Sequence, residues 1–346
     1  MPIRVFLVED SPIALNILQQ LLQTAPDLEV VGTATNGKAA LLKIPECQPH
    51  VVCTDLYMKE MDGCEFTRQL MARYPRPILV ISVAVGEAQT AFELLQAGAT
   101  DVFPKPSSGL MADYNRSELI NKIRVLAGVK VFTRPLRATP TVPTASAPPP
   151  PKVASPQRLA IVGIGASTGG PQAIAKVLQP LPAHFPVPIV CTQHISLGFL
   201  NGLVSWLSQE TKLRVTVAMA GEMPQPGVVY FAPDRHNLEI DRRGKFYLTP
   251  ADPHERHCPS VNVMFRSLAA YYGEAVVGVL LTGMGDDGAV GMRAIASVGG
   301  ITIAQDEATS VIFGMPKEAI ALGVVQYVLP IDRMGVFLQE LVTSPA

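Results

Sequence analysis

Charged and aromatic residues are scarce in this chain of 346 residues, at 16% and 6%, and it contains a single tryptophan. The 28 basic and 29 acidic side chains nearly cancel, and no basic stripe of the kind that binds nucleic acid is visible. No apolar run reaches the ~18–20 residues that a membrane-spanning helix needs. These absences argue against nucleic-acid partners and against direct insertion into a membrane.

Cysteine is also sparse, with five residues and no C-x-x-C pair. A disulfide framework or a zinc site of paired cysteines is therefore not expected. The acidic residues Glu9 and Asp10 come before the apolar core of a secretion signal could form. We expect reduced thiols in a cytoplasmic protein.

Apolar residues are abundant, at 48%, which is enough for two full-sized cores. At about 150 residues per domain, the length also predicts two domains. Residues 134–157 are rich in Pro, Ala, Thr and Ser, and they have too few large apolar side chains to offset the entropy cost of ordering. We therefore predict a first domain at 1–128, a semi-extended linker at 129–157 and a second domain at 158–346.

Short β-branched runs alternate with helical patterns before the linker. Expected strands are residues 4–8, 30–34, 51–54, 77–81 and 101–103. Apolar residues at helical spacing, from Ile13 to Leu22, mark the first of five expected helices, and the others lie near 37–44, 64–74, 87–98 and 117–126. This alternation predicts a five-stranded, doubly wound α/β domain with a parallel sheet and helices on both faces.

The second domain shows the same alternation and is predicted to be a doubly wound, mainly parallel α/β domain. Expected strands are residues 159–166, 189–192, 215–219, 228–232, 275–282 and 301–305. Expected helices are residues 172–178, 200–208, 263–272 and 289–296. In such folds ligands bind at the loops beyond the carboxyl ends of the strands.

Polar residues follow four strands of the first domain: Glu9 and Asp10, Asp55, Ser82 and Lys105. Any one of the acidic residues could simply cap a helix. Together, at one edge of a parallel sheet, they indicate a cluster of carboxylates, which repel one another unless a hard cation such as Mg²⁺ lies among them. An ionised aspartate in such a cluster can attack a phosphoryl group.

Three motifs in this domain are VEDS (8–11), D-x-x-M-x-x-M-D-G (55–63) and FPKP (103–106). With them, residues 1–128 resemble the receiver domain of bacterial response regulators. The resemblance implies that Asp55 is the phosphoacceptor and that a histidine kinase is the phosphodonor. It implies four Mg²⁺ ligands: the side chains of Glu9, Asp10 and Asp55 and the backbone carbonyl of Tyr57. It also implies three residues that respond to phosphorylation: Ser82, Phe103 and Lys105. Lys59 departs from the proline that many relatives carry.

Ser167 follows an apolar strand within a G-x-S-x-G motif at 165–169. Small flanking residues allow a sharp turn that presents the hydroxyl at the edge of the sheet. A helix beginning near Pro171 directs its N-terminal amides toward the same place. The stretch GIGASTGG also fits a glycine-rich nucleotide loop, so this motif alone leaves an esterase and a nucleotide-binding module open.

Two further strand ends favour the esterase. A serine nucleophile needs a base to take its proton and a carboxylate to orient that base. His194 and Asp287 stand where they can do this, although Asp286 could also supply the carboxylate. A dinucleotide site instead wants an acidic residue near the end of the second strand, where Thr192, Gln193 and His194 stand.

Two weaker possibilities remain in the second domain. The histidine pair His254 and His257, followed by Cys258, could suggest a metal site, but prolines bracket the segment as a loop and no further ligand has convincing spacing. A DNA-binding output domain would need a helix-turn-helix pattern, which is missing.

Five motifs in the second domain are IGASTGG (164–170), TQH (192–194), RHCPSVNVMF (256–265), LLTGMGDDGAVGM (280–292) and FGMPKEA (313–319). With them, residues 158–343 resemble the chemotaxis protein-glutamate methylesterase family. The resemblance implies catalytic Ser167, His194 and Asp287, with Thr168 and the Met284 backbone amide near the oxyanion. It implies a phosphorylation-activated serine esterase without a cofactor of its own. Its substrates would be glutamyl methyl esters of chemoreceptors, with methanol as product, and it would also deamidate glutamines.

Overall fold

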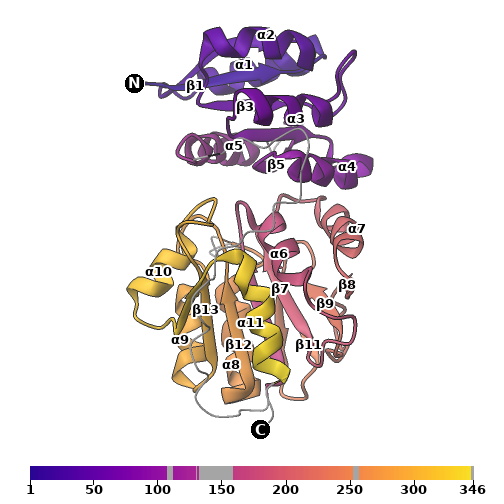
Figure 1. Cartoon of the computed structure of the whole chain (residues 1–346), viewed down its shortest axis with the longest axis vertical. Coiled ribbons are helices and arrows are strands. Elements are labelled where there is room, and N and C mark those ends of the chain that lie inside the picture. The colour runs from indigo at the N-terminus through magenta and orange to yellow at the C-terminus, as the bar shows by residue number, and fades with distance from the viewer. Residues whose placement is uncertain (107–111, 130, 132–158, 252–256, 344–346) are drawn as a thin grey trace, which may run out of the picture. The chain divides into compact units, whose positions relative to one another are not determined.

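The computed structural model describes residues 1–106, 112–129, 131, 159–251 and 257–343 (Figure 1). The chain divides into two compact units, Met1–Ala145 and Ser146–Ala346, and each is described by itself. Of the linker predicted at 129–157, only Val129 and Val131 lie within the described residues. Among the described residues, no helix has the length and apolar character needed to cross a bilayer.

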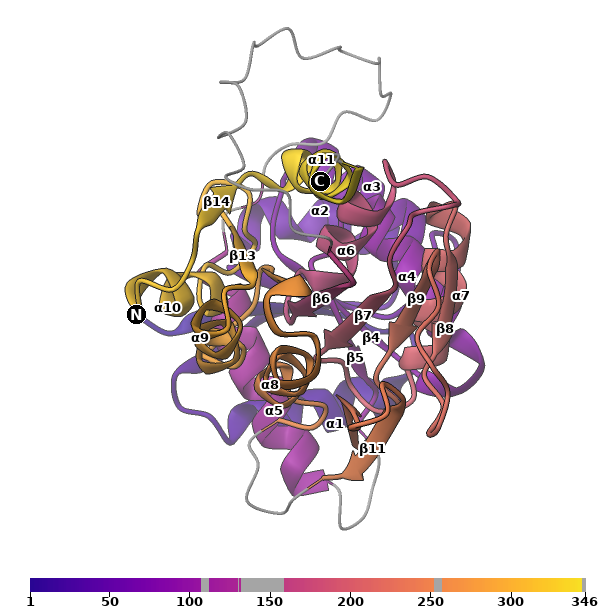
Figure 2. The ribbon, with the colours of Figure 1, turned by 90° about the horizontal axis from the view of Figure 1, so that it is seen from below.

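The first unit is built on a five-stranded parallel sheet in the order β2-β1-β3-β4-β5. Its strands are β1 (Ile3–Val8), β2 (Leu28–Ala34), β3 (Val51–Thr54), β4 (Ile78–Ser82) and β5 (Asp101–Pro104). Its helices are α1 (Pro12–Gln23), α2 (Gly37–Cys47), α3 (Gly63–Arg73), α4 (Ala84–Ala97) and α5 (Ala112–Leu126). Figure 2 shows α1 and α5 on one side of this sheet and α2, α3 and α4 on the other, as expected for a doubly wound fold.

Burial and capping explain these elements. Strands β3 and β4 are buried at every residue, which accounts for their unbroken apolar runs. Polar side chains accept hydrogen bonds from the first-turn amides of three helices and so fix where these helices begin: Ser11 for α1, Asn36 for α2 and Asp62 for α3.

The second unit is built on a seven-stranded parallel sheet in the order β14-β13-β12-β6-β7-β9-β8. Its strands are β6 (Ile161–Ala166), β7 (Ile189–Gln193), β8 (Arg214–Val217), β9 (Val228–Phe231), β12 (Val276–Leu280), β13 (Ile301–Gln305) and β14 (Tyr327–Leu329). Its helices are α6 (Gly170–Leu178), α7 (Leu200–Glu210), α8 (Val261–Tyr272), α9 (Ala289–Ser297), α10 (Met315–Ala321) and α11 (Ile331–Thr343), with a short 3₁₀ turn at Gly273–Ala275. The doubly wound α/β prediction is confirmed.

Helices cover both faces of the second sheet. Figure 2 shows α6 and α11 on one side and α8 and α9 on the other. Helix α8 packs closely on β6 because two strand residues are glycines. A Cβ atom at Gly165 would overlap the side chain of Val261, and one at Gly163 would lie 2.7 Å from Leu268 Cδ1.

Several elements of the second unit were not predicted, namely β14, α10, α11 and an antiparallel hairpin. The hairpin pairs β10 (His236–Ile240) with β11 (Phe246–Pro250). Its turn is closed by Asp241, whose carboxylate accepts the amides of Arg243 and Lys245. The signal was present in the sequence as alternating apolar residues on either side of this turn.

Candidate functional site

Three neighbouring strands at the middle of the second sheet lead to the three predicted catalytic residues. Strand β6 lies between β12 and β7, and the order of strands in the sheet reverses at β6. Ligands of open parallel sheets bind at such a switch point, beyond the carboxyl ends of the strands. Ser167 follows β6, His194 follows β7, and Asp287 lies in the loop after β12.

Ser167 lies on the turn between β6 and α6. Its backbone amide donates to the carbonyl of Thr282 at 3.0 Å, and its carbonyl accepts the Gly170 amide at 2.8 Å. Gly169 has φ +77°, the left-handed conformation that glycine adopts without strain, and a Cβ there would lie 2.6 Å from Val311. This turn places Ser167 next to the N-terminus of α6.

His194 and Asp287 form a direct hydrogen bond. The distance from His194 Nε2 to Asp287 Oδ2 is 2.9 Å. Asp287 is only 4% exposed, whereas its neighbour Asp286 is exposed. The structure therefore brings Asp287, and not Asp286, to the imidazole.

The Asp287 carboxylate also caps helix α8. It accepts hydrogen bonds from the Val261 amide at 2.8 Å, the Asn262 amide at 2.9 Å and the Ser260 hydroxyl at 3.0 Å. A helix N-terminus favours negative charge, since its first amides have no partners within the helix. Burial alone would raise the pKa of Asp287, but its hydrogen bond with His194, the charge of His194 and these amides outweigh burial and lower the pKa to about 2.

This arrangement determines which imidazole nitrogen is free. An ionised carboxylate can only accept hydrogen bonds, so Nε2 of His194 carries the hydrogen in its contact with Asp287. The lone pair of the neutral ring is then on Nδ1, which is the nitrogen available as a base.

Ser167 and His194 are neighbours across two strands. Ala166 pairs with Gln193 in the register of β6 and β7, so Ser167 and His194 are the next residues on each side. Among the described residues no hydrogen bond joins the Ser167 hydroxyl to the imidazole. Such bonds are often long without substrate and tighten when substrate binds.

His257 covers one face of the His194 ring, a contact that the sequence did not predict. Its ring stacks on that of His194, with centroids 4.5 Å apart and planes 12° apart. His254, the other histidine of the weak metal motif, lies outside the described residues. The stack depends on a contact between distant loops, and no local pattern in the sequence encodes it.

The turn that carries Ser167 also contains Thr168, and it packs against the loop that contains Met284. The loop after β12 packs against the serine, since a Cβ at Gly283 would lie 2.7 Å from Ser167 Cβ. Met284, the next residue, is 49% exposed. In the described part of the chain, the backbone N–H groups of Met284 and Thr168 make no main-chain hydrogen bond.

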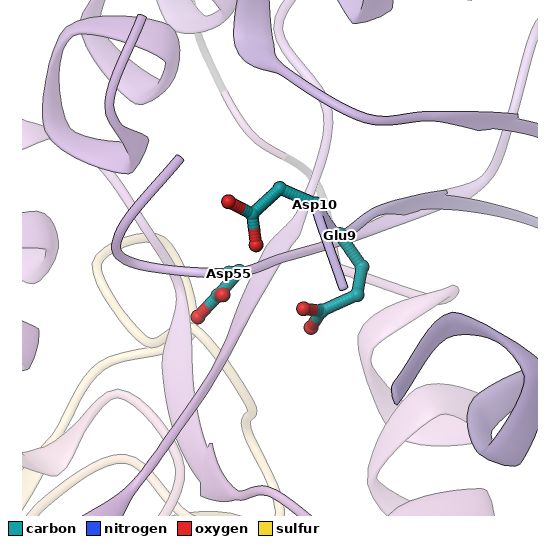
Figure 3. Close-up of side chains that lie close together, drawn as sticks. All are labelled: Glu9, Asp10 and Asp55. Atoms are coloured by element: carbon teal, nitrogen blue, oxygen red, sulfur yellow. The ribbon is translucent and has the colours of Figure 1, made fainter. Parts of the chain in front are cut away.

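The predicted carboxylate cluster of the first unit is present. One oxygen each of Glu9, Asp10 and Asp55 lies within 4.8 Å of the others, and Figure 3 shows these side chains close together. Lys105 Nζ contacts Asp55 Oδ2 at 2.7 Å and Glu9 Oε2 at 3.1 Å. The ammonium at the end of β5 therefore reaches the carboxylates after β1 and β3.

The electrostatics of this cluster fit a hard cation. Burial raises the pKa of Glu9, helped by the charge of Asp55, and burial also raises the pKa of Asp55 against the opposing effect of Lys105. Apart from its 3.1 Å contact with the Lys105 ammonium, the buried Glu9 Oε2 has no hydrogen-bond partner among the described residues. Carboxylate oxygens that are crowded and only partly neutralised are the donor set that Mg²⁺ prefers.

The other predicted receiver residues lie near the same edge. Ser82 and Phe103 are fully buried at the ends of β4 and β5, and the Lys105 amide donates to the Ser82 carbonyl at 2.9 Å. Tyr57 is half-exposed in the loop after β3, and Lys59 is exposed in the same loop.

The nucleotide-binding alternative is not supported. Gly163 and Gly165 belong to β6 rather than to a phosphate loop, and the space beside them is filled by Leu268 and Val261 of α8. These glycines therefore serve helix–sheet packing, and only Gly169 lies in the turn.

Comparison with known proteins agrees with this geometry. The CheB methylesterase family matches residues 162–338, and the response regulator receiver domain family matches residues 5–112. Protein-glutamate methylesterase/protein-glutamine glutaminase 1 of Syntrophus aciditrophicus is 39% identical over 99% of both chains. The protein of that name numbered 3 in Myxococcus xanthus is 42% identical, over 99% of this chain and 95% of its own. The crystal structure of the Thermotoga maritima CheB methylesterase catalytic domain is 40% identical and superimposes with a TM-score of 0.52, covering 53% of this chain and 99% of that domain. This chain therefore belongs to the CheB methylesterase family, a family of hydrolases, and carries a response regulator receiver domain before the enzyme domain.

Proposed function

We propose that this chain hydrolyses glutamyl γ-methyl esters on chemoreceptors, and deamidates glutamines there, with Ser167 as the nucleophile. The observation that carries the proposal is the hydrogen bond between His194 and the buried Asp287, which orients an imidazole beside the serine. The names and full-length similarity of the relatives support the same substrate class.

In the proposed reaction Nδ1 of His194 takes the proton of the Ser167 hydroxyl, whose oxygen attacks the ester carbonyl. Asp287 stabilises the imidazolium through Nε2 and stays ionised because its pKa is about 2. The developing oxyanion accepts hydrogen bonds from the amides of Met284 and Thr168. Loss of one such donor typically costs about 3–4 kcal/mol of transition-state stabilisation.

Collapse of this intermediate expels methanol, which takes its proton from the imidazolium, and leaves an acyl bond between the glutamyl carbonyl and Ser167. Water then attacks the acyl group while His194 again acts as base, and glutamate and the free serine are formed. With glutamine as substrate the leaving group is ammonia, and the remaining steps are the same. The chain needs no cofactor for this chemistry.

The proposal assigns control to the first unit. Asp55 is the phosphoacceptor and a histidine kinase is the phosphodonor. The Mg²⁺ ligands are the side chains of Glu9, Asp10 and Asp55 and the carbonyl of Tyr57, and bound Mg²⁺ would neutralise charge on the incoming phosphoryl group. Lys105 contacts phosphoryl oxygens, and Ser82 and Phe103 repack when Asp55 is phosphorylated.

The two units have separate roles in the proposal. Residues 1–128 form the receiver and residues 158–346 form the esterase, joined by a Pro- and Ala-rich linker at 129–157. A cytoplasmic location is part of the proposal, and fractionation of cells tests it.

The test measures methanol and ammonia released by the full chain from a methylated receptor fragment and from its glutamine form. Each assay is run with and without Mg²⁺ and a small-molecule phosphodonor. Both products are expected, at higher rates when Mg²⁺ and the phosphodonor are present together. Absence of methanol from a receptor that a known methylesterase demethylates would remove the proposed activity.

A further inference from the structure

Gln193, the last residue of β7, lies between the nucleophile and the base and has no role assigned above. Its side-chain amide donates one hydrogen bond to the carbonyl of Ser167 and another to the carbonyl of His194, each at 2.8 Å. The residue is only 4% exposed. A single planar amide group therefore holds the backbone of both residues.

The side-chain amide of Gln193 connects the two chain segments beyond the last main-chain hydrogen bond between β6 and β7. The last main-chain hydrogen bond between β6 and β7 runs from the His194 amide to the Ala166 carbonyl, at 2.9 Å. Beyond it the chain turns at Ser167 and continues as a loop after His194. Among the described residues, the carbonyls of Ser167 and His194 accept no main-chain hydrogen bond from the neighbouring strand, and that of Ser167 accepts the Gly170 amide within its own turn. Among the described residues, Gln193 Nε2 is the one group that hydrogen bonds to both.

The surroundings are shaped to receive this amide. A Cβ atom at Gly170, the first residue of α6, would overlap Gln193 Oε1. Glycine at 170 thus leaves the space in which the amide lies flat against the start of the helix that follows Ser167.

The oxygen of the Gln193 side-chain amide argues against a role in stability alone. Gln193 Oε1 is buried and, among the described residues, accepts no hydrogen bond. A buried acceptor without a partner is unfavourable, and an apolar side chain of similar length would avoid that cost. What glutamine adds here is the pair of donors on Nε2.

We propose that Gln193 is a positioning residue that sets the separation of Ser167 and His194 for proton transfer. The inference rests on the proposed function, since it concerns the same site. Proton transfer and attack depend steeply on geometry, and a displacement of about 1 Å can lower the rate by about 10²-fold.

The test compares wild type with Gln193→Met, which keeps the length of the side chain and removes both donors. We expect kcat per active serine, counted by full labelling with a fluorophosphonate, to fall by about 10–100-fold. KM is expected to stay within about twofold, because Gln193 is buried and binds no substrate.

Thr302→Val is the matched control. Thr302 is fully buried near the start of β13, where its hydroxyl donates to the Val324 carbonyl and accepts the Gln326 amide. The substitution also removes two buried hydrogen bonds, but at the opposite end of the strands from Ser167. It should lower the melting temperature and leave kcat per active serine unchanged.

The outcomes distinguish the proposed function from the positioning role of Gln193. An inactive wild type contradicts the proposed function itself. An active wild type with Gln193→Met within twofold of its kcat overturns the inference, and so does an equal loss of kcat in Thr302→Val. If Gln193→Met does not fold, Gln193→Leu takes its place, since leucine is also apolar and cannot donate to either carbonyl. The same loss of kcat is then expected, and a wild-type kcat overturns the inference.

Discussion

Asp287 serves both the proposed reaction and the fold of the enzyme unit, because its carboxylate hydrogen-bonds to His194 and also caps helix α8. Asp287→Asn keeps the shape but replaces one acceptor oxygen with a donor, so the imidazole loses its preferred tautomer. We expect kcat to fall by about 10³–10⁴-fold. Asp286→Asn is the control, since that neighbour is exposed, and it should stay within twofold of wild type. Equal losses in the two variants in a methanol-release assay would contradict the assignment.

The low pKa of Asp287 also predicts how stability depends on pH. Its folded-state pKa, about 2, lies below the ordinary value of 3.8, so the ionised carboxylate favours the folded state above about pH 4. This contribution, about 2 kcal/mol, is lost as pH falls from 4 toward 2. Urea unfolding between pH 5 and pH 2 should show a steeper loss of unfolding free energy for wild type than for Asp287→Asn. Parallel curves would be inconsistent with a depressed pKa.

At the residue scale, most site residues could be predicted from the sequence, but contacts between distant loops could not. Ser167, His194 and Asp55 could be selected because each follows an apolar strand of a parallel sheet. The residue pattern alone left Asp286 and Asp287 open, and only the family resemblance implied Asp287, since packing decides in which direction each of two adjacent loop residues points. The stacking of His257 on His194 has the same non-local origin.

At the scale of elements, α8 links the sheet to the site. Its close approach to β6 depends on Gly165, which leaves room for Val261, and the Val261 amide in turn binds Asp287. Gly165→Ala would push α8 away from β6. Overpacking of this kind costs about 1–3 kcal/mol of unfolding free energy, and we also expect a loss of kcat.

A second substitution tests whether overlap with Val261 causes the expected loss of stability in Gly165→Ala. Val261→Ala removes the methyl groups that an alanine at 165 would meet, and by itself leaves a small cavity. The double variant should therefore be more stable than the sum of the two single effects predicts, with a coupling of about 0.5 kcal/mol or more in urea unfolding. Additive effects would mean that the two side chains do not compete for the same space.

Most elements with strong periodicity were predicted, but helix α11 was overlooked although its buried residues Ile331, Met334, Leu338 and Leu341 have helical spacing. The strands of both sheets except β14 follow from apolar runs of the right length. The β10–β11 hairpin was overlooked although its turn and alternation were visible, so that error was one of interpretation. Strand β14 has three residues, none fully buried, and gives too short a signal to recognise.

At the scale of the whole molecule, a receiver domain and an esterase domain on one chain predict control of one by the other. Asp55→Asn removes the proposed phosphoacceptor and should abolish activation by phosphodonor and Mg²⁺ while leaving basal methanol release in place. Asp62→Asn is the matched control, because Asp62 is exposed and caps α3, a role that asparagine fills equally well. It should be activated as wild type is. Normal activation of Asp55→Asn would show that control does not pass through this residue.

The account depends most on Ser167 as nucleophile, and methanol release by Ser167→Ala tests that most directly. The substitution removes one oxygen atom at a half-buried position and should leave the fold intact. Turnover of methylated receptor, measured at matched concentrations of folded protein, is predicted to fall by about 10³-fold or more. Turnover within tenfold of wild type would contradict the serine mechanism.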